Sequence, residues 1–265
     1  MVGKENVIGI ARTPQNAEHL KVAIRKGDYN HRDQFDEALK GVDRVLLVSG
    51  MDAPDKRIQQ HRNVIEAAKQ NGVKKIVYTS IVGDEARTSF SGIVKSNRQT
   101  EKDIQQSGLA WEIGRNGIYI EPDMEYLDTY IKEGEVRNCA GEGKCGYTSR
   151  EELGHAYAQM LVNDKYNGQT NNLAGEAITQ TELVKLINHV FNTELKYKPV
   201  TVSAYQKERK AALGEFMGNI IAGIYEGIKM GAFEVEADFE KVVGRPHHSP
   251  LALISSFYEQ NKGAQ

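Results

Sequence analysis

The segment GEGKCG, residues 141–146, has the G-x-G-x-x-G spacing of a dinucleotide-binding loop. In such a loop the glycines let backbone N–H groups and a helix start approach a pyrophosphate, so the loop follows a core strand and opens a helix directly. GEGKCG instead follows the polar segment EGEVRNCA, and the next helical pattern begins only at Ser149. Asp164, the acid that would have to bind the ribose, lies in a polar turn with no strand before it. We therefore interpret GEGKCG as a tight β-turn in a hairpin-like excursion.

The chain has two cysteines, Cys139 and Cys145, which are too few for a disulfide framework and lack the partner ligands of a zinc site. We expect both to be free thiols. A lowered pKa of Cys145, caused by its neighbour Lys144, is the less favoured alternative. No Ser-His-Asp order and no metal-ligand cluster is visible, so the sequence predicts neither a nucleophilic triad nor a metal site.

Short β-branched runs alternate with longer amphipathic segments in the first half, which is typical of a parallel sheet flanked by helices. We expect strands at 7–11, 22–24, 43–49, 74–80 and 109–117, and helices at 35–41, 54–71 and 95–107. Capping patterns predict further helices beginning at Ser149, Thr179 and Ser203, the last of them after a strand over 195–202. The C-terminal third is therefore expected to be mainly helical and to form a cap over the sheet.

The composition excludes several classes of protein. The 34 basic and 36 acidic side chains nearly balance, so the sequence does not suggest a nucleic-acid partner. The longest apolar runs are far shorter than the ~20 residues that a membrane span needs. The N-terminal segment MVGKENVIGIARTP lacks the features of a secretory signal, so we expect a soluble, cytoplasmic protein.

The first predicted strand, 7–11, ends at Arg12-Thr13-Pro14. In a dinucleotide-binding sheet the second strand ends with the group that selects the ribose, an acid for NAD or an arginine for the 2′-phosphate of NADP. The strand over 7–11 therefore has the character of a second strand in an NADP-binding sheet. The first strand and its glycine-rich loop are then missing from the front of the sequence.

A set of motifs spread over the whole chain resembles one family. The motifs are IARTP (10–14), GDYN (27–30), DEALKGVDRVLLVSG (36–50), QHRNVIEAAKQNGVKKIVYTS (60–80), TEKDIQQSG (100–108), GRNGIY (114–119), AGEGKCGYTSREELGHAYA (140–158), NLAGE (172–176) and VVGRPHHSP (242–250). In this order they resemble the NmrA-like atypical short-chain dehydrogenase/reductases, and among these the bacterial NAD(P)H-quinone oxidoreductases. The resemblance implies a Rossmann-like, doubly wound parallel α/β sheet with a small, mainly helical substrate cap.

The resemblance also implies a cofactor site. It places Arg12 at the 2′-phosphate of NADPH, which makes NADPH preferred over NADH, and Asp28 and Tyr29 beside the adenine. Other implied contacts are Ser49, Gly50 and Met51 at the middle of the cofactor, Asn116, Gly117, Ile118, Tyr119, Ile120 and Glu121 at the nicotinamide and substrate cavity, and Lys144 reaching in from the excursion loop. Each has a plainer alternative: Arg12 or Lys144 as a solvated side chain, Ser49-Gly50 as a turn, and Asn116-Gly117 as a loop with a positive φ.

The sequence departs from the family pattern at two places. The family begins with a strand and a G-x-x-G-x-x-G loop that this sequence lacks, and the missing strand is the central one. Its absence would leave two half-sheets with unpaired inner edges. We expect the native product to be longer, with Met1 an internal methionine; otherwise the fold closes over the gap and the pyrophosphate site is degraded. The second departure is Asn97, which stands where some NmrA-like reductases place a lysine or histidine.

No catalytic residue is identified from the sequence. Tyr225-x-x-x-Lys229 matches the Tyr-x-x-x-Lys signature of the broader superfamily, but it lies in the cap and we interpret it as a coincidence. Hydride transfer to a quinone yields a hydroquinone anion that water can protonate, so a general acid is dispensable. Tyr119, Tyr78 and Phe90 are candidate neighbours of the rings.

The resemblance therefore implies an NADPH-dependent reductase of quinone-like or related carbonyl acceptors. Two alternatives stay open: a non-catalytic redox sensor that binds dinucleotide and a protein partner, and a truncated form that has lost cofactor binding. We expect a Rossmann-like domain over 1–135 and a mostly helical substrate-binding part over 136–265, of which 148–175 packs back on the sheet. The expected partner is a small quinone-like molecule, and the sequence is compatible with a homo-oligomer.

Overall fold

The chain divides into two compact units, each built from segments that are distant in sequence. In this computed structural model the first unit is Met1–Ser80, Lys95–Gly114 and Tyr157–Thr170, and the second is Ile81–Val94, Arg115–Ala156 and Asn171–Gln265. The structure describes residues 2–261. Met1, on which the expectation of a longer product rests, lies outside them.

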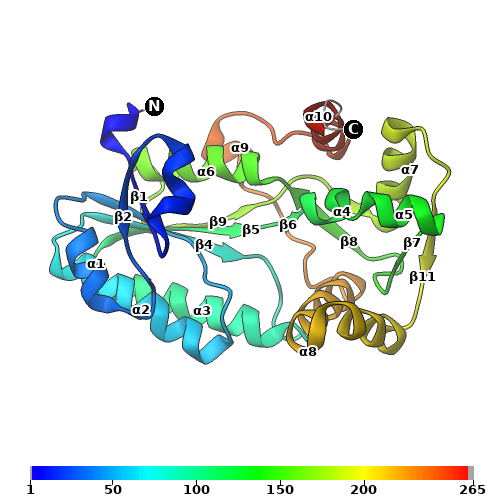
Figure 1. Cartoon of the computed structure of the whole chain (residues 1–265), viewed down its shortest axis with the longest axis horizontal. Coiled ribbons are helices and arrows are strands. Elements are labelled where there is room, and N and C mark those ends of the chain that lie inside the picture. The colour runs from blue at the N-terminus through cyan, green and yellow to red at the C-terminus, as the bar shows by residue number, and fades with distance from the viewer. Residues whose placement is uncertain (1, 262–265) are drawn as a thin grey trace. The chain divides into compact units, whose positions relative to one another are not determined.

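The main sheet begins in the first unit and has the strand order β3-β4-β5-β9. Strands β3 and β4 are parallel, with Arg44 opposite Lys75 and Leu47 opposite Tyr78. Helices α2 and α3 run along one face of this sheet (Figure 1). The bounds are β3 Arg44–Leu47, α2 Pro54–Gln70, β4 Lys75–Ile81, α3 Ser91–Gln105, β5 Ala110–Asn116, α6 Arg150–Val162 and β9 Thr170–Leu173. The expected parallel sheet with flanking helices is confirmed.

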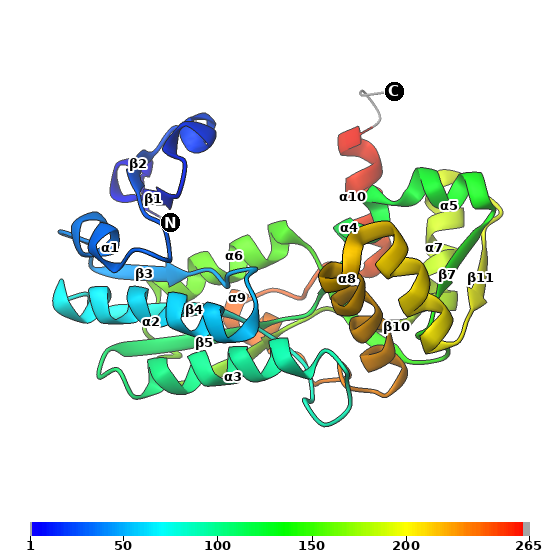
Figure 2. The same ribbon diagram turned by 60° about the horizontal axis from the view of Figure 1, so that its bottom comes forward.

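The strands β1 (Ile8–Ala11) and β2 (Ala23–Lys26) form a separate parallel pair in the first unit. Figure 2 shows this pair apart from the ribbon of β3. The 3₁₀ helices η1 (Lys4–Asn6) and η2 (Pro14–Leu20) flank β1, and helix α1 (Arg32–Ala38) follows β2. Among residues 2–261, β1 pairs with β2 alone and β3 is the terminal strand of its sheet. The two half-sheets expected from the missing central strand are therefore present.

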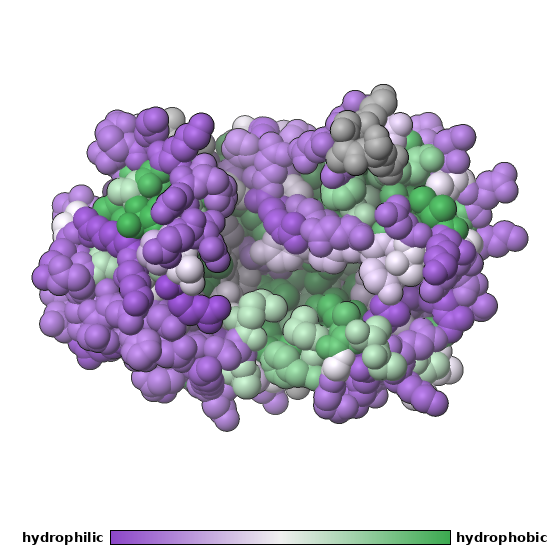
Figure 3. All heavy atoms as spheres, in the orientation of Figure 1, coloured by the Kyte–Doolittle hydropathy of each residue, from purple (hydrophilic) through white to green (hydrophobic). Residues whose placement is uncertain are grey.

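The second unit holds two small sheets, of order β10-β8-β6 and β11-β7. Their strands are β6 Ile118–Tyr119, β7 Glu135–Asn138, β8 Lys144–Thr148, β10 Ala177–Thr179 and β11 Lys196–Pro199. The helices are α4 Glu121–Glu125, α5 Leu127–Glu133, α7 Gln180–Phe191, α8 Val202–Lys229, α9 Phe239–Val243 and α10 Pro250–Asn261. Apolar residues gather over α8 on the face drawn in Figure 3. Leu213 and Phe216 of α8 are both exposed. No helix within residues 2–261 combines the length and the apolar character needed to cross a bilayer.

Two of the three predicted helix starts are confirmed and one is wrong. The Ser149 hydroxyl accepts a hydrogen bond from the Glu152 N–H before α6, and Thr179 forms a complete capping box with Glu182 before α7. Ser203, however, lies inside α8, and the cap is Thr201, whose side chain accepts from the Ala204 N–H. The preceding strand also ends earlier than predicted, at Pro199. The Val200 N–H still donates to the Asn138 carbonyl oxygen, and the chain then turns into α8, which Thr201 caps.

The corrected cap predicts different effects for two neighbouring hydroxyls. We expect Thr201→Ala to lower the free energy of unfolding by about 1 kcal/mol, because an N-terminal N–H of α8 loses its acceptor. Ser203→Ala is the matched control and is expected to change stability by less than about 0.5 kcal/mol. Urea denaturation followed by circular dichroism measures both, and an equal loss for the two variants would contradict the assignment.

Candidate functional site

In the first unit, Arg12 directly follows β1 and is exposed. It makes no hydrogen bond or ion pair with any other residue of the described range 2–261. Its charge nevertheless contributes to lowering the pKa values of Asp28 and Asp52, for which hydrogen bonds from Asn30 and from Gln60 respectively are the larger causes. Arg12 therefore lies near the residues that follow β2 and β3. Because Asn30 and Gln60 satisfy the two carboxylates, the guanidinium stays available to an external anion.

Tyr29 connects the ends of β2 and β3 within the first unit. Its hydroxyl donates to the Val48 carbonyl oxygen at 2.7 Å, and its ring stacks on Phe35 with the centroids 5.5 Å apart. Burial raises the pKa of Tyr29 to about 12. One face of the ring is thus committed to packing on Phe35, which leaves the rest of the half-buried ring for a ligand beside Asp28.

Gly50 and Met51 form the exposed end of the β3 segment. The Gly50 N–H donates to His61 Nε2 at 3.0 Å, which places the ring proton on Nδ1, where it faces Thr100 Oγ1 at 2.9 Å. Burial, together with the charge of Arg57, lowers the pKa of His61 to about 3, so this histidine is neutral. Met51 is 73% exposed. His61 therefore fixes the backbone at Gly50 and leaves the Met51 side chain free to cover a ligand.

Asn97, in the first unit, is the centre of a buried polar cluster. Its side-chain oxygen accepts from Tyr78 Oη at 2.7 Å, from Arg57 Nη2 at 3.0 Å and from Ser49 Oγ at 3.1 Å. Asn97 is almost completely buried. Since three donors converge on one neutral oxygen, Asn97 organises the end of β3 rather than supplying a proton.

Residues 116–121 lie in the second unit, in β5, β6 and the start of α4. The Asn116 side chain donates to Tyr119 Oη at 2.9 Å, and Ile118 and Tyr119 pair with Tyr147 and Thr148 of β8. The Ile120 N–H continues this pairing to the Thr148 carbonyl oxygen, and a Glu121 oxygen accepts from the Arg150 N–H at 2.6 Å. The backbone of the segment is thus held rigidly, and Tyr119, which is 37% exposed, presents its ring at the surface of the unit.

The glycines of GEGKCG serve close backbone packing. A Cβ on Gly143 would lie 2.2 Å from the Ile228 carbonyl oxygen, and one on Gly146 would lie 2.7 Å from that of Gly175. The turn is confirmed by a hydrogen bond from the Gly143 N–H to the Ala140 carbonyl oxygen. The hairpin-like pairing is wrong, because β7 pairs with β11 whereas β8 pairs with β6 and β10. Residues 144–146 are in β8, so no helix opens directly behind the glycines.

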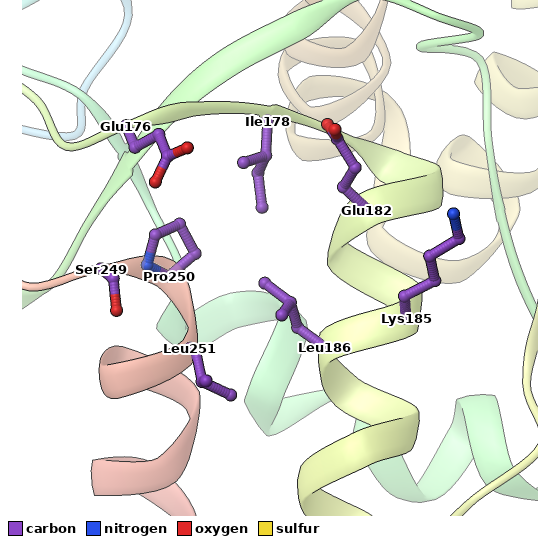
Figure 4. A pocket seen from close by; sticks show the side chains of 8 residues that line it. All are labelled: Glu176, Ile178, Glu182, Lys185, Leu186, Ser249, Pro250 and Leu251. Carbon is purple, nitrogen blue, oxygen red and sulfur yellow. The ribbon is translucent and has the colours of Figure 1, made fainter.

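Lys144 begins β8 opposite Thr179 and is exposed. Its charge is among the smaller causes that lower the pKa of Glu182, after the hydrogen bonds from Thr179. Glu182 also lines a cavity of about 290 Å³. Figure 4 shows this cavity between β10, α7 and the start of α10, with the apolar side chains of Ile178, Leu186 and Leu251 around it. It lies at the small end of the range for ligand pockets, and it does not have the size to enclose a dinucleotide.

The other candidate groups are buried and unreactive. Both cysteines are free, as predicted. Burial raises the pKa of Cys139 to about 11 and raises that of Cys145 further, so the alternative of a lowered Cys145 pKa is wrong. Tyr225 donates to Asp123 at 3.1 Å, and burial raises its pKa well above the usual value. In the described range, no group of three or more His, Cys, Asp or Glu side chains is arranged to hold a metal ion.

Two features of the structure were not predicted from the sequence. The first is Arg57, which is 5% exposed and has a buried Nε without a hydrogen-bond partner. The sequence contained an indication of it: the spacing of Arg57, Gln60 and His61 places three polar side chains on one face of α2. The second is Asp123, a buried carboxyl that accepts from Tyr130, Tyr147 and Tyr225. No local pattern indicates it, because its donors come from three separate elements.

Similarity to known proteins extends over nearly the whole chain. A family model described as NAD(P)H-binding matches residues 2–164. Quinone oxidoreductase 2 of Escherichia coli K12 is 29% identical over 266 residues, covering 98% of this chain and 92% of the relative. The crystal structure of the E. coli NADPH-dependent quinone oxidoreductase with NADPH aligns with a TM-score of 0.89 and 26% identity, covering 97% of this chain and 92% of that one. Triphenylmethane reductase of Citrobacter sp. with NADP(H) aligns with a TM-score of 0.86 at 26% identity, with the same coverage.

Proposed function

This chain belongs to the NAD(P)H-binding family as an NmrA-like atypical short-chain dehydrogenase/reductase with a Rossmann-like fold, and from that premise we propose that it reduces quinone-like acceptors with NADPH. It is an NAD(P)H-dependent oxidoreductase that uses a nicotinamide cofactor. The observation that carries the quinone proposal is the similarity to E. coli quinone oxidoreductase 2 over 98% of this chain.

The residues of the first unit fit the adenosine half of the cofactor. Arg12, exposed and unpaired among residues 2–261, binds the 2′-phosphate, since guanidinium groups recognise phosphate through charge-assisted hydrogen bonds. Asp28 and Tyr29 flank the adenine. Ser49, Gly50 and Met51 border the middle of the cofactor, where His61 and Asn97 fix the backbone and the Ser49 hydroxyl.

The second unit supplies the segment that borders the nicotinamide and the acceptor. The bound cofactor supplies the hydride, and residues 116–121 with Tyr119 orient the rings and exclude water. Lys144, exposed at the start of β8, is the cation of this unit that we assign to the cofactor. No side chain in this proposal donates the proton: Asn97 is neutral and its oxygen is an acceptor, so water protonates the reduced acceptor.

The second candidate is a dinucleotide-binding sensor without turnover. It is favoured by Asn97, which is buried and fully engaged where some relatives place an ionisable group.

Two measurements on the purified chain separate these candidates. NADPH fluorescence titrated with protein is expected to change with submillimolar affinity, and an unchanged signal would reject both binding functions. We then expect NADPH oxidation with menadione to exceed the rate without protein severalfold or more. Binding with no turnover above that control would favour the sensor.

A further inference from the structure

The second unit contains a larger cavity that the proposed function does not use. It has a volume of about 740 Å³ and lies among Tyr126, α5, β7 and the first half of α8. This volume is within the range of small-molecule sites. Three tyrosines line it, Tyr126, Tyr130 and Tyr205, and of these Tyr126, which is 36% exposed, offers ring surface to the cavity, together with charged groups.

Arg209 is the distinctive charge in this cavity. Its guanidinium lies 5.3 Å from the centroid of the Tyr205 ring and 5.5 Å from that of Tyr126. Its Nε is buried without a hydrogen-bond partner. Tyr126 forms a side-chain hydrogen bond with the guanidinium, and the charge of Glu208 helps to raise the pKa of Arg209, although no ion pair joins the two side chains within residues 2–261. Because the neighbouring Glu208 is committed to an ion pair with Arg137, this half-buried cation between two rings is an attractive site for an anion.

The other charges of the cavity are already paired or open to solvent. Arg137 is held by Glu135 and Glu208, and Glu135 is also held by Lys198. Glu133, at the end of α5, is exposed, so water and salt screen its charge. Arg209 is therefore a cation of the cavity that still has an N–H group free to donate a hydrogen bond, at Nε.

We propose that this cavity binds a planar aromatic acid, with its ring against Tyr126 and its carboxylate on Arg209. Guanidinium and carboxylate groups match in geometry and form paired hydrogen bonds, and the aromatic walls supply the apolar contact area. The site lies wholly within the second unit and involves none of the residues assigned to the cofactor.

The test is calorimetric titration of the whole chain with 2-naphthoate and with 2-naphthamide, which share the ring system and differ in charge. We expect 2-naphthoate to bind with submillimolar affinity and the amide at least tenfold more weakly. Arg209→Gln is expected to abolish this difference and to weaken 2-naphthoate about tenfold or more. Arg209→Lys is expected to restore part of the affinity, because the charge returns without the planar fork.

Lys198→Gln is the matched control, since it removes a cation beside the cavity while Glu135 keeps its ion pair with Arg137. We expect its affinity for 2-naphthoate to stay within about twofold of the unchanged chain. Absence of heat at millimolar 2-naphthoate, equal binding of the amide, or an Arg209→Gln variant with native circular dichroism and unchanged affinity would each overturn the proposal.

Discussion

Replacing Arg12 by alanine is expected to raise the Kd for NADPH by about 10- to 100-fold and to change the Kd for NADH by less than about twofold. The 2′-phosphate is the difference between the two cofactors, and charge-assisted hydrogen bonds to a guanidinium account for an effect of this size. The structure supports the assignment because Arg12 is exposed and makes no ion pair within residues 2–261, while Asn30 and Gln60 hydrogen-bond to the neighbouring carboxylates of Asp28 and Asp52. Fluorescence titrations with both cofactors measure the effect.

Arg87→Ala is a suitable control for the Arg12 variant, because Arg87 is an exposed arginine of the second unit that pairs with Asp84. It is expected to leave the affinity for both cofactors unchanged. Arg12→Lys is expected to retain part of the preference for NADPH, since the charge remains but the bidentate geometry is lost. Equal weakening of NADPH and NADH by Arg12→Ala would instead indicate a general effect on the β1 segment.

The elements that carry the cofactor residues were predictable because their signals are local. The apolar runs over 44–47 and 75–81 identify buried parallel strands, and Thr179 with Glu182 forms the predicted capping box. The cap of α8 was misplaced because Thr201 and Ser203 are both good capping residues. Only the backbone geometry, extended at Thr201, distinguishes them.

The internal support of the site was not predictable from local patterns. Asn97 receives hydrogen bonds from Ser49, Arg57 and Tyr78, which are far apart in sequence, so no spacing reveals their convergence. The structural role of GEGKCG was also not predictable from its local pattern. Its glycines are explained by the approach of the Ile228 and Gly175 carbonyl groups, which are distant in the chain. A short pattern of glycines indicates positions where a side chain does not fit, but it does not identify the residue that lies too close.

The open edges of β1 and β3 predict a second large effect. An N-terminal extension that supplies one strand, a G-x-x-G-x-x-G loop and a helix is expected to raise both stability and NADPH affinity. Pairing with both edges adds several backbone hydrogen bonds at about 1 kcal/mol each, and the glycine loop brings backbone N–H groups to the pyrophosphate. We expect the free energy of unfolding to rise by about 2–4 kcal/mol after the entropy of ordering is subtracted, and the NADPH Kd to fall by tenfold or more.

Two variants of this extension distinguish the effect of the added strand from the effect of the glycine loop. If the loop glycines are replaced by valine, the stability gain is expected to remain while the gain in NADPH affinity is lost, because side chains then keep the backbone from the phosphates. If the strand carries two prolines, both gains are expected to disappear, since proline removes donors from the ladder. Urea denaturation and NADPH titration on the three extended chains measure this. A proline version as stable as the intact one would mean that β1 and β3 do not accept a strand, and the pyrophosphate would then have to be bound by the residues that follow β3.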